Sequence, residues 1–326
     1  MVLTKKRIVF ITIALVVVLF VLLMNMPESI VGHRGDNLFL FLPQILFLAI
    51  TAAIVLSLLL VVIFRNEYLK SQLITFNRYK YYLKLLVKRD FVNKYRKSIL
   101  GVLWSFLNPL LTMIVMSFVF SHLFRNDIEN FPVWVFSGQL IFNFFQESTT
   151  LAMTSVIASE GVIKKVYVPK YIFPLSRVIS SLINVFFTFV SFMLVFTVTG
   201  SQFYWTMLLI PIPLLYVFVF SLGVAMFLSS MAVFFRDLTY LYGVLTLMLF
   251  FLTPIMYHPS IIPAHFQGLY GLNPMFQFLQ YFRSVAMDGV VPDLWTNMVC
   301  IGLALTSLCV GTYVFMKQQD KYILSL

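Results

Sequence analysis

The sequence predicts an all-α polytopic membrane protein that crosses the bilayer about eight times. Of its 326 residues, 61% are hydrophobic and only 11% are charged, whereas a soluble domain carries roughly 25% charged residues. Apolar stretches of about 20 residues, the length that spans a bilayer, recur along the chain. The basic residues gather between alternate stretches, as in a protein of fixed membrane orientation.

The apolar stretches define the expected spans. These are Ile8–Met24, Leu38–Phe64, Gly101–Phe124, Phe131–Thr154, Pro174–Thr199, Trp205–Phe235, Leu238–Tyr257 and Leu294–Met316. The first two form an N-terminal hairpin within residues 1–66. The first could instead be a cleaved signal peptide, but it exceeds the usual apolar core of about 7–15 residues and no small-x-small cleavage site comes after it, which favours a retained helix.

The net charge of +11 is explained by topology. With the N-terminus in the cytosol, all of the 23 Lys and Arg residues except Arg34, Arg125 and Arg283 lie on the cytosolic side. This positive-inside bias predicts a multi-pass protein of the cytoplasmic (inner) membrane with both termini in the cytosol. Membrane lipids are therefore expected partners, and nucleic acid is not.

The longest cytosolic stretch, residues 67–100, predicts a helix on the membrane surface. Its core, Arg78–Lys97, contains no Gly or Pro. At 100° per residue, one arc holds Tyr79, Tyr82, Leu83, Leu86 and Val87, and another holds Lys80, Lys84 and Lys88. Such a helix lies in the interface with its lysines toward lipid phosphates. The alternative is a solvated linker helix.

The turn between the fourth and fifth spans predicts a short helix. Ser159, Glu160 and Gly161 can begin it, and it then runs through Tyr167 until Pro169 ends it. A short helix with apolar and basic residues in the cytosol is typical of a docking surface for another protein. An ordinary connecting loop explains the same residues.

An external segment, His258–Asp293, is too apolar for a free loop. Asn273 and Pro274 are typical of a helix N-cap followed by Pro at the first helical position. The helix Met275–Met287 should then carry Phe276, Phe278, Tyr281 and Phe282. We expect it to dip back into the outer leaflet or to cap a vestibule.

Catalytic chemistry is nearly absent from the sequence. There is no G-x-x-x-x-G-K-[ST] phosphate loop, so we expect no ATP site of that kind here. The histidines, His33, His122, His258 and His265, do not have metal-ligand spacing, and no paired carboxylates face the outer surface. The chain is thus expected to be a conduit, with no catalytic residues, metal or cofactor of its own.

Four separated blocks carry a family resemblance. The first is Arg89-Asp90, Lys94-Tyr95-Arg96, Ser98, Leu100-Gly101, Trp104 and Pro109-Leu110; the second is Val162 to Pro169; the third is Phe234 to Asp237 with Thr253 to Tyr257; the fourth is Leu272 to Met275. Together they resemble ABC-2 type permeases that export polysaccharides, the family of O-antigen, capsule and teichoic acid transporters. The resemblance covers about Arg78 to Lys317. The hairpin 1–66 departs from it, since members usually begin near the interfacial helix.

The resemblance implies a type V exporter-like core of six spans within residues 101–326. It implies an interfacial helix with Tyr79, Lys84, Arg89, Asp90, Tyr95 and Arg96. It also implies a cytosolic coupling helix at 160–170 with Glu160, Gly161, Ile163, Lys164, Lys165, Tyr167 and Pro169. External gate helices within 258–293 would use Asn273, Pro274, Phe276, Tyr281 and Phe282.

By this resemblance, the chain forms a homodimer and pairs with two copies of an ABC ATPase subunit, which binds ATP and Mg. The exported substrate would be an undecaprenyl-linked polysaccharide. A drug or small-lipid exporter on the same fold is the alternative within transport. A membrane glycosyltransferase or acyltransferase is the alternative from another class.

A substrate path is expected along the fourth span. Asn143, Glu147, Thr150 and Thr154 recur at helical spacing and form one polar stripe. Glu147 is the only acidic residue well inside a predicted span, and a carboxylate there should face protein or water. The stripe could line the conduit, or it could join helices by hydrogen bonds. Nearby are Trp134, Phe142 and Phe145, whose rings could stack on sugars or simply pack.

Overall fold

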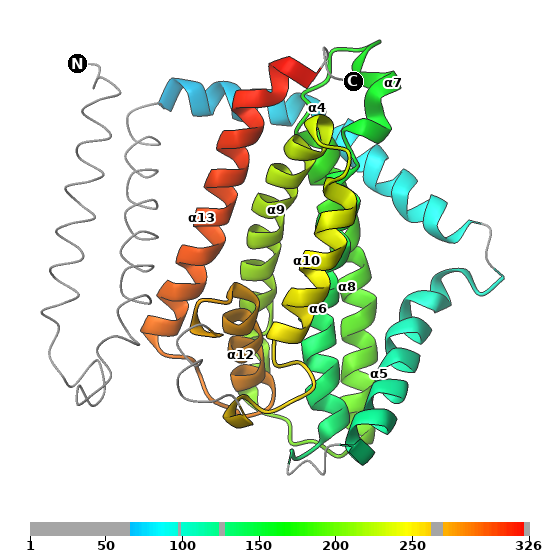
Figure 1. Ribbon diagram of the computed structural model, residues 1–326, viewed down its shortest axis with the longest axis vertical. Helices are drawn as coiled ribbons and strands as arrows, with labels where there is room; N and C mark the ends of the chain where they lie inside the picture. Colours follow the sequence, from blue (N-terminus) through cyan, green and yellow to red (C-terminus); the bar gives the residue numbers. More distant parts are fainter. Residues whose placement is uncertain (1–65, 97–98, 124–127, 262–269, 323–326) are drawn as a thin grey trace, which may run out of the picture.

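The computed structural model describes residues 66–96, 99–123, 128–261 and 270–322, and the elements assigned there are all helical. The predicted hairpin 1–66, with spans Ile8–Met24 and Leu38–Phe64, lies outside these residues save for Asn66. The long helices stand side by side in an upright bundle (Figure 1). They are α5 (Trp104–Leu123), α6 (Phe131–Met153), α8 (Ile172–Val198), α9 (Pro211–Phe234), α10 (Leu238–Leu252) and α13 (Leu294–Gln318).

Four stretches of the described chain are long and apolar enough to cross a membrane: Gly101–Phe120, Ile172–Val198, Trp205–Phe234 and Leu294–Lys321. Helix α6 has a span's length, 23 residues, but carries the polar stripe. Helix α10 has only 15 residues. The predicted span Leu238–Tyr257 was therefore too long. Thr253 is extended (φ −96°, ψ 127°), because the residue before Pro254 is disfavoured from helical geometry.

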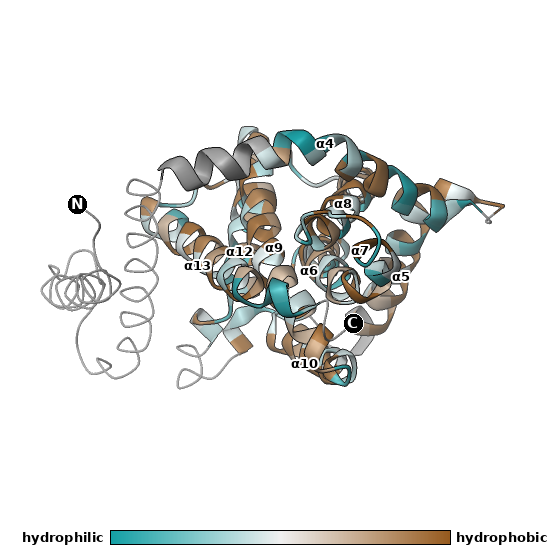
Figure 2. Ribbon diagram, turned by 90° about the horizontal axis from the view of Figure 1, so that it is seen from above, coloured by the Kyte–Doolittle hydropathy of each residue, from teal (hydrophilic) through white to brown (hydrophobic). Residues whose placement is uncertain are grey.

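Helix α4 (Asn66–Tyr95) lies across one end of the bundle (Figures 1 and 2). It begins earlier than predicted. Leu83 and Leu86 are buried with Ile172, Phe173 and Phe315 in one apolar cluster, so the predicted apolar arc faces protein. The arc of Lys80, Lys84 and Lys88 is exposed, and its contact with lipid phosphates remains a prediction.

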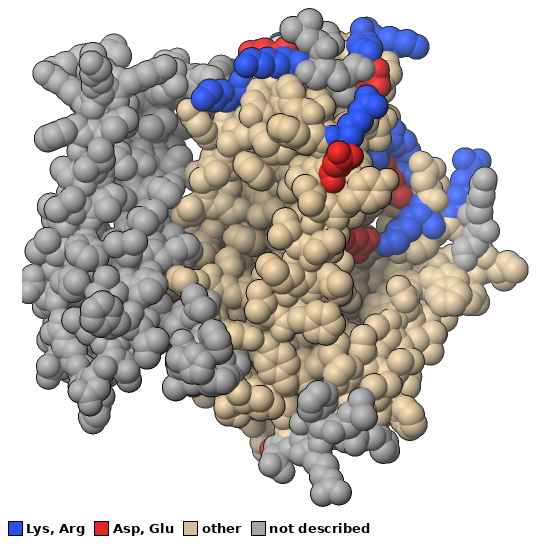
Figure 3. All heavy atoms as spheres, viewed as in Figure 1, with Lys and Arg blue, Asp and Glu red and all other residues tan. Residues whose placement is uncertain are grey.

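The charged side chains are concentrated at one end of the molecule. Lys and Arg side chains gather where α4 and the short helix α7 (Glu160–Ile163) lie, and the visible surface of the lower part is nearly uncharged (Figure 3). We call this the basic end; the C-terminal end of α13 also lies there (Figure 1). At the far end, α12 (Pro274–Ala286) packs against α6, α9 and α13.

Helix α6 is the centre of the bundle, in contact with α5, α8, α9, α10 and α12. Its buried side belongs to the main apolar core, together with Phe192, Val217 and Phe278 from three other helices. Because one side of α6 is fully used for packing, its polar stripe is turned away from the core. The stripe is thereby free to line a polar surface between α6 and its neighbours.

Candidate functional site

A polar groove with a volume of about 700 Å³ opens between α4, α5, α6 and α8. Its lining is Lys94, Tyr95, Trp104, Ser105, Asn108, Pro109, Asn143, Gln146, Glu147, Thr150, Leu151, Asn184 and Thr188. Most of these side chains are amides and hydroxyls, and two are charged. A cavity of this composition suits a ligand that offers many hydroxyl groups.

Helical spacing on α6 builds one wall of the polar groove. Asn143, Gln146, Glu147 and Thr150 are separated by steps of three and one, so they share one face. Thr154, the last member of the predicted stripe, is exposed but does not line the groove. Gln146 was not predicted, although its position three residues after Asn143 and four before Thr150 would have placed it on the same face.

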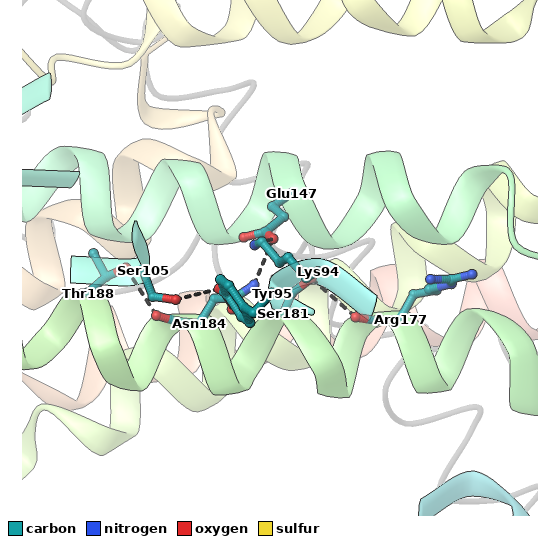
Figure 4. A network of polar contacts seen from close by, with 8 residues as sticks. All are labelled: Lys94, Tyr95, Ser105, Glu147, Arg177, Ser181, Asn184 and Thr188. Carbon is teal, nitrogen blue, oxygen red and sulfur yellow. Dashed lines mark hydrogen bonds and ion pairs between the residues drawn. The ribbon is translucent and has the colours of Figure 1, made fainter. Parts of the chain in front are cut away.

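Glu147 joins three helices while it lines the groove. Its Oε1 accepts hydrogen bonds from Lys94 Nζ of α4 and from Asn184 Nδ2 of α8, each at 2.7 Å. Figure 4 shows Glu147 reaching from α6 toward both partners. The carboxylate thus faces protein and the groove, as a charge at this depth requires. Of the two predicted roles of the stripe, joining helices applies to this residue, and lining the conduit remains a prediction.

A second set of hydrogen bonds extends this network. Tyr95 Oη donates to Asn184 Oδ1 at 3.1 Å, and Ser105 Oγ donates to Tyr95 Oη. The end of α4 and the start of α5 are thereby fixed to α8 (Figure 4). The wall of the groove formed by these helices is held in place by side-chain contacts.

Other polar side chains of the groove are available to bind a ligand. Asn108, Asn143 and Gln146 are exposed, and the hydrogen bonds that Asn108 and Gln146 accept from other described residues use their backbone oxygens and not their amides. Amides that lack partners within a membrane-spanning bundle are costly unless water or a polar ligand binds them. The groove therefore favours a polar occupant.

The predicted path aromatics lie elsewhere. Phe142 and Phe145 are 1% and 4% exposed and pack edge-to-face or tilted against Phe250 and Phe220. They are core residues and do not line the groove, because they lie on the packed side of α6. Trp134 lies near the N-terminus of α6, and its ring contacts Arg283 and His258. The groove instead exposes Trp104, which is 45% accessible.

The far end contains the predicted gate residues. Asn273 caps α12, accepting a hydrogen bond from the Met275 backbone N–H at 3.0 Å, and Pro274 is the first helical residue; the expected N-cap is confirmed. Tyr281 and Phe282 are buried against the bundle, and Phe276 is half-buried. Their role as a gate remains a prediction.

Arg283 of α12 was expected only as an external cation, and its structural role was not predicted. It is 4% exposed and donates to Ser137 Oγ and to the backbone oxygens of Pro254, Trp134 and Ile255 at 2.8–3.1 Å. Its guanidinium lies 3.6 Å from the centre of the Trp134 ring. This clamp fixes α12 to α6 and to the extended chain after α10.

At the basic end, the predicted coupling helix is shorter than expected. Helix α7 ends at Ile163, and a turn comes directly after it. Ile163 is buried with Ile172 and Phe173, which anchors the end of the helix to the bundle. The predicted helix through Tyr167 was wrong, since Val168 precedes Pro169 and the chain is already outside helical geometry there.

The segment 160–170 has an exposed rim and two fixed points. Gly161, Lys164, Lys165, Val166 and Tyr167 are exposed, and Pro169 is half-buried. Lys164 Nζ pairs with Glu160 at 2.5 Å. One fixed point is the Tyr79 hydroxyl, which donates to the Tyr167 backbone oxygen at 3.2 Å; the other is Lys170, which donates to the Gln319 backbone oxygen.

The interfacial residues of α4 divide into anchors and exposed cations. The carboxylate of Asp90, whose side chain is 6% exposed, pairs with Arg177 of α8 and with its neighbour Arg89, both at 3.2 Å. The pair of Asp90 with Arg177 fixes α4 to α8. Lys84 and Arg96 are exposed. Among the described residues, no group of three His, Cys, Asp or Glu could hold a metal ion.

Comparisons with known proteins agree with this architecture. Residues 81–287 match the ABC-2 type transporter family. An O-antigen export system permease protein RfbA of Klebsiella pneumoniae is 30% identical over 74% of this chain and 93% of its own length. One of Myxococcus xanthus is 29% identical over 76% of this chain and 96% of its own. The polysialic acid transport protein KpsM of Escherichia coli is 19% identical over 74% of this chain and 95% of its own. The chain belongs to the ABC-2 type transporter family.

Proposed function

We propose that this chain is the permease subunit of an ABC transporter that exports lipid-linked polysaccharide across the cytoplasmic membrane. The observation that carries the proposal is the match to O-antigen export permeases over more than nine-tenths of their length. It is supported by apolar spans in the described chain and by a polar groove that suits hydroxyl-rich ligands. The basic end is assigned to the cytosol by the positive-inside rule.

ATP hydrolysis is assigned to a separate partner, because this chain contains no phosphate loop. The exposed rim of segment 160–170 supports docking of that ATPase: Tyr167 is 90% and Val166 is 56% exposed beside two lysines. Large exposed apolar and basic side chains at a cytosolic surface are typical of a protein interface. Motion of the ATPases would then reach α4 through Tyr79 and reach α13 through Lys170.

The functional unit is proposed to be a dimer of this chain with two ATPase subunits. One copy leaves apolar residues of α5 and α10 on its surface, including Ile114, Phe118, Val244 and Met248. A second copy that meets these helices would enclose a conduit between two α6 stripes. A long glycan needs such a continuous conduit more than an occluded pocket.

Deletion of the gene tests this function. A strain that lacks the chain should accumulate an undecaprenyl-linked polymer in the cytosol and lose it from the surface, and a plasmid copy should reverse both effects. The purified chain should bring down an ATPase and hydrolyse no ATP alone. An unchanged surface glycan with accumulation of a drug or ordinary lipid would favour the other kind of exporter. Turnover of a lipid-linked sugar by the isolated chain would point to a transferase.

A further inference from the structure

The polar groove contains one cation among its described lining residues, Lys94. This lysine lies in the last turn of α4, the helix across the basic end. Its side chain is 47% exposed, and Nζ has one carboxylate partner, Glu147 Oε1 at 2.7 Å. An ammonium group has three N–H donors. Lys94 therefore retains donors that can bind another anion from the groove.

The ion pair can open without loss of the surrounding structure. Glu147 also accepts a hydrogen bond from Asn184 at 2.7 Å, so its carboxylate stays fixed when Lys94 turns away. Asn184 is held in turn by Tyr95. Lys94 is thus the exchangeable member of the network, and Glu147 and Asn184 are its fixed members (Figure 4).

The remainder of the groove is neutral and hydrogen-bonding. Asn108, Asn143 and Gln146 line it and offer amides that can both donate and accept, and these amides have no partner among the described residues. Trp104, 45% exposed, adds an aromatic ring to the same lining. The groove therefore joins one cationic position to a neutral surface suited to hydroxyl groups and an apolar ring face.

We propose that the polar groove binds the junction between the phosphate and the first sugar of a lipid-linked glycan. In this arrangement Lys94 binds the phosphate, and Asn143 and Gln146 bind sugar hydroxyls. The proposal rests on the proposed function and assigns its substrate-recognition residues. The phosphate chemistry is shared by a polyprenyl diphosphate carrier and an ordinary anionic phospholipid, so the experiment must separate these two sources.

Equilibrium binding to the full-length chain in complex with its ATPase, in nanodiscs, gives this separation. The radiolabelled probes are a polyprenyl diphosphate that carries one sugar, the sugar-free polyprenyl diphosphate, and phosphatidylglycerol. The sugar-bearing probe should bind about tenfold more tightly than the sugar-free one, because its hydroxyl groups add hydrogen bonds to Asn143 and Gln146. Equal binding of phosphatidylglycerol, with full competition, would show a phospholipid site and overturn the proposal.

Three substitutions test the role of Lys94. Lys94→Gln should weaken both polyprenyl diphosphate probes about tenfold or more, and Lys94→Arg should restore most of the binding. Glu147→Gln should tighten the sugar-free probe, because it removes the negative charge that competes for Lys94, while the amide oxygen can still accept from Asn184. If the network were only structural, Lys94→Gln and Glu147→Gln would weaken all probes together and lower the melting temperature equally.

Two further variants complete the test. Asn143→Ala combined with Gln146→Ala should reduce binding of the sugar-bearing probe to the level of the sugar-free probe. The control Lys84→Gln removes an exposed cation of the same helix outside the groove and should change neither. Normal export with binding unaffected by Lys94→Gln would refute the groove assignment and leave the function standing. An unchanged surface glycan in the deletion strain would instead refute the function, whatever the groove binds.

Discussion

Gly223 of α9 and Gly311 of α13 are in backbone contact. A Cβ on Gly311 would lie 1.9 Å from the Gly223 backbone oxygen, and a Cβ on Gly223 would lie 2.2 Å from the Ser307 carbonyl carbon. Without a side chain at either position, the two spans approach more closely than other residues allow. Small residues permit such contacts between membrane helices, where dispersion and not the hydrophobic effect holds helices together.

Alanine at either glycine should therefore destabilise the protein. We expect Gly223→Ala and Gly311→Ala each to cost about 1–3 kcal/mol, since backbone must shift to admit the methyl group. Thermal unfolding in detergent measures the effect. Gly243→Ala of α10 is the matched control, because nothing lies within 4 Å of its added Cβ. Equal melting temperatures for all three variants would contradict the close contact.

The Arg283 clamp predicts a second stability effect. Arg283→Met would leave the backbone oxygens of Pro254 and Ile255 without their donor, while Ser137 Oγ still donates to the Trp134 oxygen. Each buried polar group left unpaired costs about 1–3 kcal/mol. Arg283→Lys should restore only part of the lost stability, because a single ammonium cannot reproduce the planar guanidinium fork. Limited proteolysis after α12 reports its release. The control is Arg236→Met, at an exposed position, which should leave the cleavage pattern unchanged. An unchanged cleavage pattern in Arg283→Met would show that the clamp does not stabilise the protein.

Burial of Phe142 predicts a defect of folding and not of recognition. Phe142→Ala should lower stability by about 3–5 kcal/mol, with export per folded complex unchanged. Phe186→Ala, at a position 64% exposed on α8, should cost almost nothing. The comparison needs the melting temperature and the export rate normalised to intact complex. A stable Phe142→Ala variant with slowed export would place this ring in the path after all.

Charge reversal tests whether the exposed rim of segment 160–170 docks the ATPase. Lys164→Glu with Lys165→Glu should reduce copurification of the ATPase while membrane insertion stays normal, because reversal brings like charges together at the rim of an interface. Lys164 already pairs with Glu160, so Lys165→Glu alone gives the cleaner result. The matched control is Lys80→Glu with Lys84→Glu, which makes the same change of charge at exposed positions of α4. Copurification equal to wild type in the rim variant would make the segment a simple connection.

Much of the fold could be predicted because its signals are local. Apolar length predicted the boundaries of most long helices in the described chain within a few residues, and the Asn273–Pro274 pair predicted the start of α12. The helical spacing of the α6 stripe placed Asn143, Glu147 and Thr150 on one face, and the structure puts all three in one groove. Each of these depends on neighbours in the sequence.

The features of the fold and the site that could not be predicted depend on residues distant in the sequence. Nothing near Glu147 reveals that Lys94 and Asn184 meet at its Oε1, and nothing near Arg283 reveals four acceptors from α6 and the chain after α10. For Phe142, path lining and packing were both left open, because composition cannot distinguish the packed side of a membrane helix from its open side. Ile163, the last residue of α7, is buried with Ile172 and Phe173, and this anchoring is also a tertiary effect.

The proposed function of this subunit is ATP-driven movement of a lipid-linked polysaccharide. Proteoliposomes that contain the chain and its ATPase, with labelled lipid-linked glycan on the ATPase side, measure this movement directly. Glycan should become protected inside the vesicles only when ATP is added and both subunits are present. Protection without ATP or without this chain, or ATP-dependent transport of other lipids with none of the glycan, would contradict the account.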